Sequence, residues 1–106
     1  MPKFLFDASY TAEGVRGVQS SGGSARRDIV AKAIEGLGGT LESFYFAFGE
    51  RDAFVVADLP DNESAVALAM AVGATGTVGI KTTVLVTPEE VDSAAQKSVS
   101  YTPPGG

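Results

Sequence analysis

The spacing of hydrophobic residues separates candidate strands from candidate helices along the chain. Residues 3–10 place aromatic side chains at alternate positions, and residues 40–48 are denser still in aromatics. Residues 52–59 are mostly apolar, and residues 76–87 are rich in β-branched side chains. Such alternation and composition are typical of strands with at least one buried face. The pattern therefore predicts four strands.

Other segments have the spacing or the composition of helices. Residues 25–37 carry an apolar stripe at helical spacing, and residues 64–75 are almost wholly small or apolar. Residues 88–97 begin with proline and two glutamates, which is a strong helix start. Residues 11–20 form a weaker candidate, because each of its two internal glycines costs a helix roughly 1 kcal/mol relative to alanine.

Capping residues stand at the expected ends of these helices. We predict N-caps at Thr11, Ser24 and Thr87, and at either Asp61 or Asn62. The glycine pair at 38–39 supplies the left-handed backbone with which helices commonly end.

The resulting order is strand, helix, strand, strand, helix, strand, followed by a terminal helix. This order predicts an α+β, ferredoxin-like βαββαβ fold with a C-terminal helix, in which the main helices cover one face of an antiparallel four-stranded sheet. We expect one domain over residues 1–97 and a flexible C-terminal tail over residues 98–106.

The sheet face without helices is not predicted to be polar. The strand at 40–48 has apolar groups on both faces, with Leu41, Tyr45 and Ala47 alternating with Phe44, Phe46 and Phe48. A contiguous apolar face of more than a few hundred Å² rarely stays exposed on a soluble monomer. We therefore expect a homodimer packed sheet to sheet, or a higher homo-oligomer; the alternative is a monomer with a partly apolar surface.

Composition excludes several kinds of chemistry. The 106 residues contain no histidine, cysteine or tryptophan. Imidazole bases, thiol nucleophiles, thiolate metal sites and imidazole-ligated haem are therefore excluded. A metal could be held by oxygen ligands alone, and we predict neither a metal nor a cofactor.

The net charge and the N-terminal sequence limit the binding partners and the cellular location that we expect for the protein. Thirteen acidic and eight basic residues give a net charge of −5, so we expect no nucleic acid as a partner. No basic amphipathic segment suits a membrane surface, and the apolar run at residues 4–6 is too short for a signal peptide or a span. We expect a cytoplasmic protein.

Without histidine, proton transfer would have to use other side chains. Asp7 and Asp58 lie inside predicted strands, where carboxylates are usually depleted. The candidate catalytic residues are Asp7, Tyr45, Asp58 and Lys81. The alternatives for the aspartates are charges at the rim of the sheet, or ion pairs with Lys81 or Arg16. Lys81 could pair with an aspartate in the middle of the sheet or bind an anionic ligand; the favoured alternative is a solvated strand residue that guards against aggregation of the sheet.

Candidate ligand-binding residues lie outside the strand centres. Gly22-Gly23-Ser24 followed by Arg26 and Arg27 combines backbone N–H groups with cations, a combination that can hold a phosphate or carboxylate. A plain helix break with a serine cap explains the same residues. Tyr10 and Asp52 complete the set; the segment 49–52 is either a gate or interface, or a hairpin turn in which Gly49 takes a positive φ and Asp52 bonds to backbone.

Several blocks of sequence resemble the GYD domain family, over roughly residues 3–97. They read FLFDASYTAEG at 4–14, GGSARR at 22–27, LGG at 37–39, FYFAFGERD at 44–52, DLPD at 58–61 and TPEE at 87–90. The resemblance implies the dimeric α/β-barrel superfamily, in which two ferredoxin-like protomers form a barrel. Gly49 and Asp52 fit the motif that names the family, but Arg51 stands where a tyrosine is expected, so no role of that tyrosine is carried over.

Two functions from different classes follow. Relatives in the superfamily carry out cofactor-free oxygenation, isomerisation or ligand binding. The first hypothesis is therefore that the protein binds a small organic molecule in a mostly apolar cavity between the sheets. The second is a structural module that assembles into oligomers without catalysis. The residues leave open whether the protein is an enzyme. Convergence of Asp7, Tyr45, Asp58 and Lys81 on an enclosed cavity would favour the first.

Overall fold

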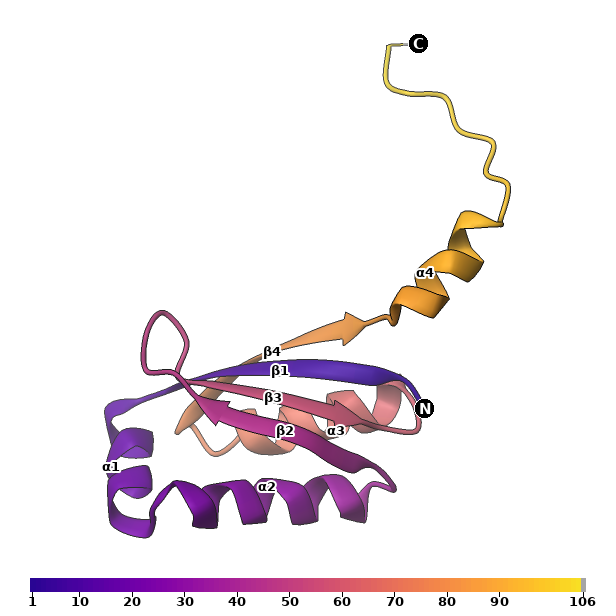
Figure 1. Cartoon of the computed structure of the whole chain (residues 1–106). Coiled ribbons are helices and arrows are strands. Elements are labelled where there is room, and N and C mark those ends of the chain that lie inside the picture. Colours follow the sequence, from indigo (N-terminus) through magenta and orange to yellow (C-terminus); the bar gives the residue numbers. More distant parts are fainter. Residues whose placement is uncertain (106) are drawn as a thin grey trace.

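Four antiparallel strands form a single sheet in the order β2-β3-β1-β4. The computed structural model of the protein describes residues 1–105. The strands are β1 (Lys3–Tyr10), β2 (Thr40–Phe46), β3 (Ala53–Asp58) and β4 (Val78–Leu85) (Figure 1). β1 lies in the middle of the sheet and pairs with β3 on one side and β4 on the other.

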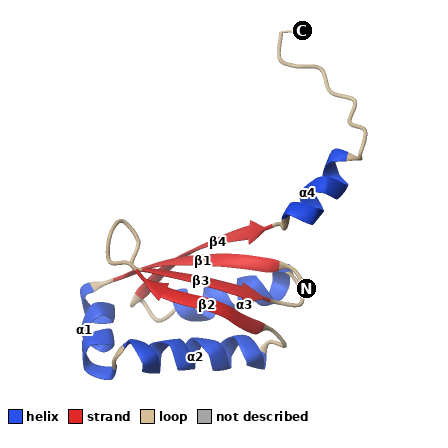
Figure 2. Ribbon diagram, in the orientation of Figure 1, coloured by secondary structure: helices blue, strands red, loops and turns tan. Residues whose placement is uncertain are grey.

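Two helices separate β1 from β2, one helix separates β3 from β4, and a fourth follows β4. They are α1 (Ala12–Ser21), α2 (Gly23–Gly36), α3 (Asn62–Gly73) and α4 (Pro88–Ala95). α1, α2 and α3 lie on one side of the sheet, whereas α4 projects away from it (Figure 1; Figure 2). This arrangement confirms the predicted α+β, ferredoxin-like fold with a C-terminal helix.

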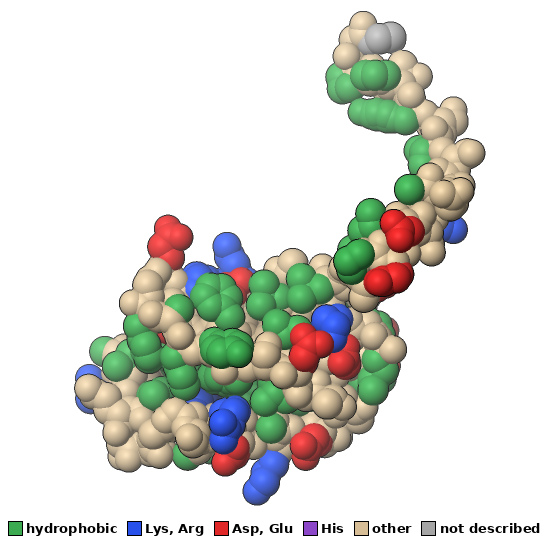
Figure 3. All heavy atoms as spheres, viewed as in Figure 1, with side chains coloured by type: hydrophobic (Ala, Val, Ile, Leu, Met, Phe, Trp, Pro, Cys, Tyr) green, Lys and Arg blue, Asp and Glu red, His purple; other side chains and the backbone are tan. Residues whose placement is uncertain are grey.

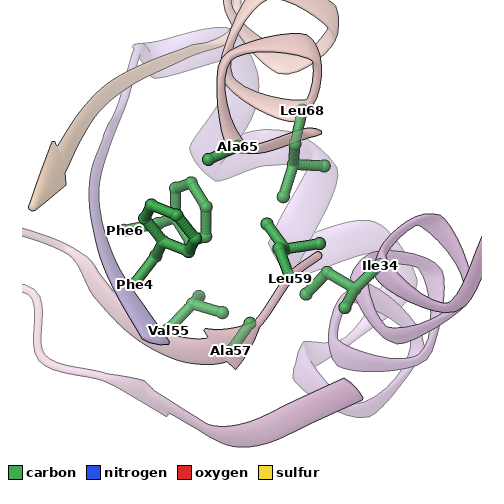
Figure 4. Close-up of a cluster of buried hydrophobic side chains, with 8 residues drawn as sticks. All are labelled: Phe4, Phe6, Ile34, Val55, Ala57, Leu59, Ala65 and Leu68. Atoms are coloured by element: carbon green, nitrogen blue, oxygen red, sulfur yellow. The ribbon is translucent and has the colours of Figure 1, made fainter. Parts of the chain in front are cut away.

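The core lies between the sheet and the helices. Alternate residues of β1 and β3 are buried there, because side chains two positions apart on a strand share a face. The main cluster consists of Phe4, Phe6, Ile34, Val55, Ala57, Leu59, Ala65 and Leu68, whose side chains point toward one another in Figure 4. The helices therefore cover this face of the sheet along β1 and β3.

The other face of the sheet carries no helix, and we call it the open face. Strand alternation and register assign it Leu5, Asp7, Ser9, Tyr45, Phe54, Val56, Lys81, Thr83 and Leu85. Among these, Tyr45 is 71% exposed and Phe54 38%. The open face is therefore mixed, with apolar side chains from all four strands beside a central group of charges.

The predicted alternation along β2 is wrong at Leu41. The register of β2 against β3 shifts between Leu41 and Ser43, which is an irregularity of the bulge type. An extra residue in one strand moves all later side chains by one position relative to the partner strand. Leu41 consequently packs on the core together with Phe44, instead of sharing the open face with Tyr45.

Two boundaries also differ from the predicted ones. α2 begins at Gly23 with Gly22 (φ 89°) as its N-cap, so the predicted cap at Ser24 is wrong. β2 ends at Phe46, and the residue with positive φ in the following loop is Phe48 (φ 53°), not Gly49. The loop from β2 to β3 is therefore longer than the predicted turn and is closed by a hydrogen bond from the Ala47 N–H to the Asp52 carbonyl (2.8 Å).

The other caps are confirmed. The Thr11 hydroxyl accepts a hydrogen bond from the Gly14 N–H, and Thr87 forms a full capping box with Glu90. Of the two candidates before α3, the structure uses Asp61, whose pKa is lowered because the Ser64 hydroxyl and backbone N–H donate to its carboxylate. Gly38 (φ 85°) provides the left-handed exit from α2.

Two remaining features are the possible membrane spans and the C-terminal end of the chain. No helix within residues 1–105 is long and apolar enough to cross a membrane. The boundary between a domain at 1–97 and a tail at 98–106 stays a prediction, and Gly106 lies outside the described residues.

Candidate functional site

Asp7 lies at the centre of a polar cluster on the open face. Arg51 Nη2 approaches Asp7 Oδ1 to 2.5 Å, and Arg51 Nη1 donates to Ser9 Oγ at 3.1 Å. The Asp7 side chain is only 14% exposed. A guanidinium that contacts a carboxylate and a hydroxyl at once has its direction fixed, so Arg51 holds the β2–β3 loop over β1.

The loop is anchored to β1 at a second point. The Asp52 N–H donates to the Ala8 carbonyl at 2.8 Å, and the Asp52 carboxylate accepts a hydrogen bond from the Tyr10 N–H at 2.7 Å. Asp52, a candidate ligand-binding residue, therefore bonds to backbone and positions Arg51. Sequence reasoning missed Arg51 as the partner of Asp7, because it is the long-range antiparallel register of β1 with β3, which pairs Ala53 with Ala8, that places residue 51 beside the end of β1.

Two of the other candidate catalytic residues, Tyr45 and Lys81, lie on the open face together with Asp7. Lys81 lies directly opposite Asp7 in the β1–β4 register and is exposed; it forms no ion pair with any residue of 1–105. Tyr45 pairs with Phe54 on the far side of β3 and is largely exposed. These side chains share a surface, and the charges of Arg51 and Lys81 flank one carboxylate.

Asp58 is separate from this cluster. It is the last residue of β3 rather than an interior one, and its Oδ1 accepts a hydrogen bond from Lys3 Nζ at 2.9 Å. Lys3 also donates to Glu42, and these hydrogen bonds, first to Glu42 and then to Asp58, raise the pKa of Lys3. Asp58 thus fits the alternative of a charge at the rim of the sheet. It forms an ion pair, with Lys3 as the partner.

A cleft lies on the opposite side of the sheet, where α2 packs on β2 and α3 packs on β4. Its deep part has a volume of about 40 Å³. Small side chains form its floor, with Ala8 from β1 and Ala53 from β3, and apolar residues of α2 and α3 form its walls, among them Val30 and Val72. We call this space the helix–sheet cleft.

Tyr10 and Arg26 stand at the border between the deep part and a wider mouth. The mouth has a volume of about 360 Å³ and lies between α1, α2 and the start of β4. Tyr10, Arg26 and Val78 line both parts. Among the residues that line the deep part, Arg26 is the only charged one. Two of the predicted ligand-binding residues are thus brought together.

Arg26 and Arg27 differ although they are neighbours. The Arg27 guanidinium pairs with Asp28 at 3.3 Å, and Arg27 lines a separate shallow hollow beside Phe44 and Phe46. Arg26 forms no ion pair within the described part of the chain. Adjacent helix positions point in directions about 100° apart, which is why Arg26 alone reaches the helix–sheet cleft.

Gly14 allows α1 to pack directly against the loop before β4. A Cβ atom on Gly14 would lie 2.3 Å from the Thr77 carbonyl oxygen. The same carbonyl accepts a hydrogen bond from the Thr11 N–H at 2.9 Å, so the start of α1 is held against the loop before β4. The glycine that weakened the predicted helix is therefore required by this close approach.

The cleft can bind an apolar group in its deep part and an anion at Arg26. A guanidinium offers paired N–H donors that match a carboxylate. Glu13 lines the mouth and places a negative charge on the approach to it. Within residues 1–105, no three acidic side chains are grouped as ligands for a metal ion.

Comparison with known proteins identifies the family. The model of the GYD domain matches residues 4–95, which is most of the 106-residue chain. Neither the curated proteins nor the solved structures include a significant match. Since the match begins in β1 and ends at the last residue of α4, it covers every strand and helix described above. The chain belongs to the GYD domain family.

Proposed function

We propose that this GYD domain protein binds a small carboxylic acid in the helix–sheet cleft, with the carboxylate on Arg26 and the hydrocarbon part in the deep part of the cleft. The observation that carries the proposal is Arg26 itself, a guanidinium without an ion-pair partner in residues 1–105, at the edge of an otherwise apolar space. Cations in such positions are usually paired or bind an anion.

The chemistry of the walls supports a monocarboxylate rather than a more polar ligand. Apart from Tyr10 and Arg26, the deep part is lined by hydrocarbon side chains, which offer no partner to a second polar group. An unpaired polar group there would lose its hydrogen bonds with water and gain none. Binding of a polyanion is further opposed by Glu13 at the mouth.

The test uses butanoate as the probe, because the deep part of the cleft, at about 40 Å³, has room for only a short hydrocarbon chain; isothermal titration calorimetry is the measurement. We expect butanoate to bind the unmodified protein and 1-butanol to bind more weakly, because the alcohol lacks the charge that Arg26 recognises. Arg26→Gln should weaken butanoate binding by at least about tenfold, equivalent to about 1.4 kcal/mol. Circular dichroism of each variant establishes that it is folded.

Arg27→Gln is the matched control, since Arg27 is the adjacent arginine and pairs with Asp28. We expect it to leave butanoate affinity within about twofold of the unmodified value. Glu13→Gln should strengthen binding, because it removes from the mouth a negative charge that repels the carboxylate of the ligand. Equal affinity of the Arg26→Gln and Arg27→Gln variants, or no binding of butanoate at millimolar concentration, would refute the proposal.

A second role is favoured by the open face. We infer that the protein self-associates through this face, sheet to sheet, as an assembly module whether or not the cleft is filled. The exposed rings of Tyr45 and Phe54 lie side by side on β2 and β3 and support this role. Their burial against a second copy would contribute about 25 cal/mol per Å², offset by the costs of association.

Light scattering at micromolar concentration tests the self-association. We expect a dimer or a larger assembly for the unmodified chain, and dissociation of the Tyr45→Asp variant, which places a charge on the open face. Lys32→Asp on the exposed side of α2 is the control for a new carboxylate elsewhere. A monomer mass for the unmodified chain would contradict the inference.

A further inference from the structure

The chain continues beyond the sheet as an arm that does not pack on its own body. We call residues 86–105 the C-terminal arm. α4 has no buried residue, and all residues after Thr87 up to 105 are exposed. Figure 1 shows the arm extending away from the sheet, and the radius of gyration is 16.9 Å, against about 13 Å for a compact domain of 100 residues.

The arm is nevertheless specified in detail by its sequence. Thr87 and Glu90 form a capping box, and Pro88 occupies the first turn of α4. Helices shorter than about 12 residues are marginal in water unless they pack on something. α4 spans only residues 88–95. We therefore expect this short, fully capped helix to be stabilised by packing on another surface.

One side of the arm has the character of an interface. Val91, Ala94 and Ala95 fall at the spacing of a single helical stripe. Beyond the helix, Val99 is 81% exposed and Tyr101 64% exposed. Figure 3 shows hydrophobic side chains at intervals along the arm as well as on the body. Together they form a run of apolar groups without a cover.

The arm is directed away from its own sheet by the strand that precedes it. β4 is held against β1 as far as Leu85, which pairs with Lys3. Val86 follows, and Thr87 is already the extended N-cap of α4 (ψ 160°). Only Val86 lies between the end of β4 and this N-cap, and α4 continues away from the sheet with no buried residue (Figure 1).

A second copy of the chain offers the complementary surface. The arm begins at Val86, directly after Leu85, which belongs to the open face, so self-association through this face brings the arm of each copy to the margin of its partner. The arm carries three carboxylates, at positions 89, 90 and 92, against a single lysine. On the open face, Lys81 is exposed and forms no ion pair among the described residues. The start of the arm beside the open face and the opposite charges of the arm and Lys81 therefore favour a second copy as the occupant.

We propose that the C-terminal arms of two copies are exchanged, so that Val91, Val99 and Tyr101 of each copy are buried on the other at the margin of the paired open faces. This exchange rests on the self-association proposed above. It assigns the arm to an interface with a second copy of the same chain rather than to a flexible tail.

The full chain with Tyr101→Trp tests the exchange, because the sequence contains no other tryptophan. Emission wavelength and mass by light scattering are followed together during dilution from high micromolar to nanomolar concentration. We expect blue-shifted emission in the dimer, and a red shift on dilution with the same midpoint as the loss of mass. In the same background, Val91→Asp should weaken the dimer by at least about tenfold.

Ser93→Asp is the matched control, since it adds the same charge to the opposite side of α4. We expect it to change the dimer dissociation constant by less than about twofold. A dimer in which the introduced indole emits at the wavelength of a fully exposed one would overturn the exchange and leave the sheet-to-sheet dimer standing. A monomer at every concentration would overturn both, and blue emission that persists in the monomer would place the arm on its own chain. Equal effects of the two aspartate substitutions would also count against the exchange.

Discussion

The Phe4→Ala variant is expected to lose about 3 to 5 kcal/mol of its free energy of unfolding. Phe4 is 1% exposed and lies in the central strand, within the main cluster of the core. Its removal takes away the transfer free energy of the ring and leaves a cavity that Phe6 and Leu68 cannot fill without leaving their own contacts. Since small domains are stable by about 5 to 15 kcal/mol, this loss is a large part of the total.

Urea denaturation followed by circular dichroism measures the loss. The control is Val66→Ala, which shortens an exposed side chain on α3 and should change the free energy of unfolding by less than about 0.5 kcal/mol. If Phe4→Ala costs no more than Val66→Ala, the core does not lie where the structure places it.

The second large effect is expected at Gly39, where Gly39→Ala should destabilise the protein by about 3 kcal/mol. A Cβ atom on Gly39 would lie 2.2 Å from the Asp58 carbonyl oxygen and 2.7 Å from Leu59 Cδ2. The backbone at Asp58 is held by β3 and cannot move aside cheaply. The turn between α2 and β2 would have to open, and the hydrogen bond from the Gly39 N–H to the Ile34 carbonyl would be strained.

Gly36→Ala is the comparison that isolates this contact. Gly36 is the last residue of α2, and nothing lies within 4 Å of a Cβ atom placed on it. Alanine there should stabilise the protein, by about 0.5 kcal/mol, because it reduces the freedom of the unfolded chain. Thermal unfolding of both variants gives the sign directly, and destabilisation of equal size at the two positions would refute the close packing at Gly39.

Local signals are sufficient for most of the secondary structure. Thr11, Asp61 and Thr87 each act as caps because their side chains reach the backbone within the same turn, a contact that depends on sequence separation alone. Gly38 takes its positive φ for an equally local reason. The order of the elements then limits the topology, since few connections of these lengths are possible.

Predictions fail where a contact between distant segments decides the conformation. Leu41 is packed on the core by a shift in the register of β2 against β3, which alternation within β2 cannot reveal. Phe48 takes the positive φ expected for Gly49, in a loop that is anchored through Asp52 to Ala8 and Tyr10 of β1.

The sequence predicts which residues belong to the candidate site, but not which side chains contact one another. Tyr10 and Arg26 are both expected to bind a ligand, and they do border one cleft, but neither their convergence nor the side of the sheet follows from the sequence. Lys81 and Arg16 are the expected ion-pair partners of Asp7, which contacts Arg51 instead. Arg51 stands where the resemblance to the family leads us to expect a tyrosine, so the expectation for this position gives no sign of an ion pair with Asp7.

Residue types and short spacings along the chain are sufficient to predict the secondary-structure elements and most of their caps. They are also sufficient to recognise the family and to exclude imidazole and thiol chemistry. Which charges meet depends on the folded chain, because Asp7 and Arg51 are 44 positions apart and are joined by the register of the sheet. The fold also separates Arg26 from Arg27, and it sends the C-terminal arm away from its own body. The reason is common to all three: side-chain partners are set by packing between segments, and packing is not encoded in any one of them.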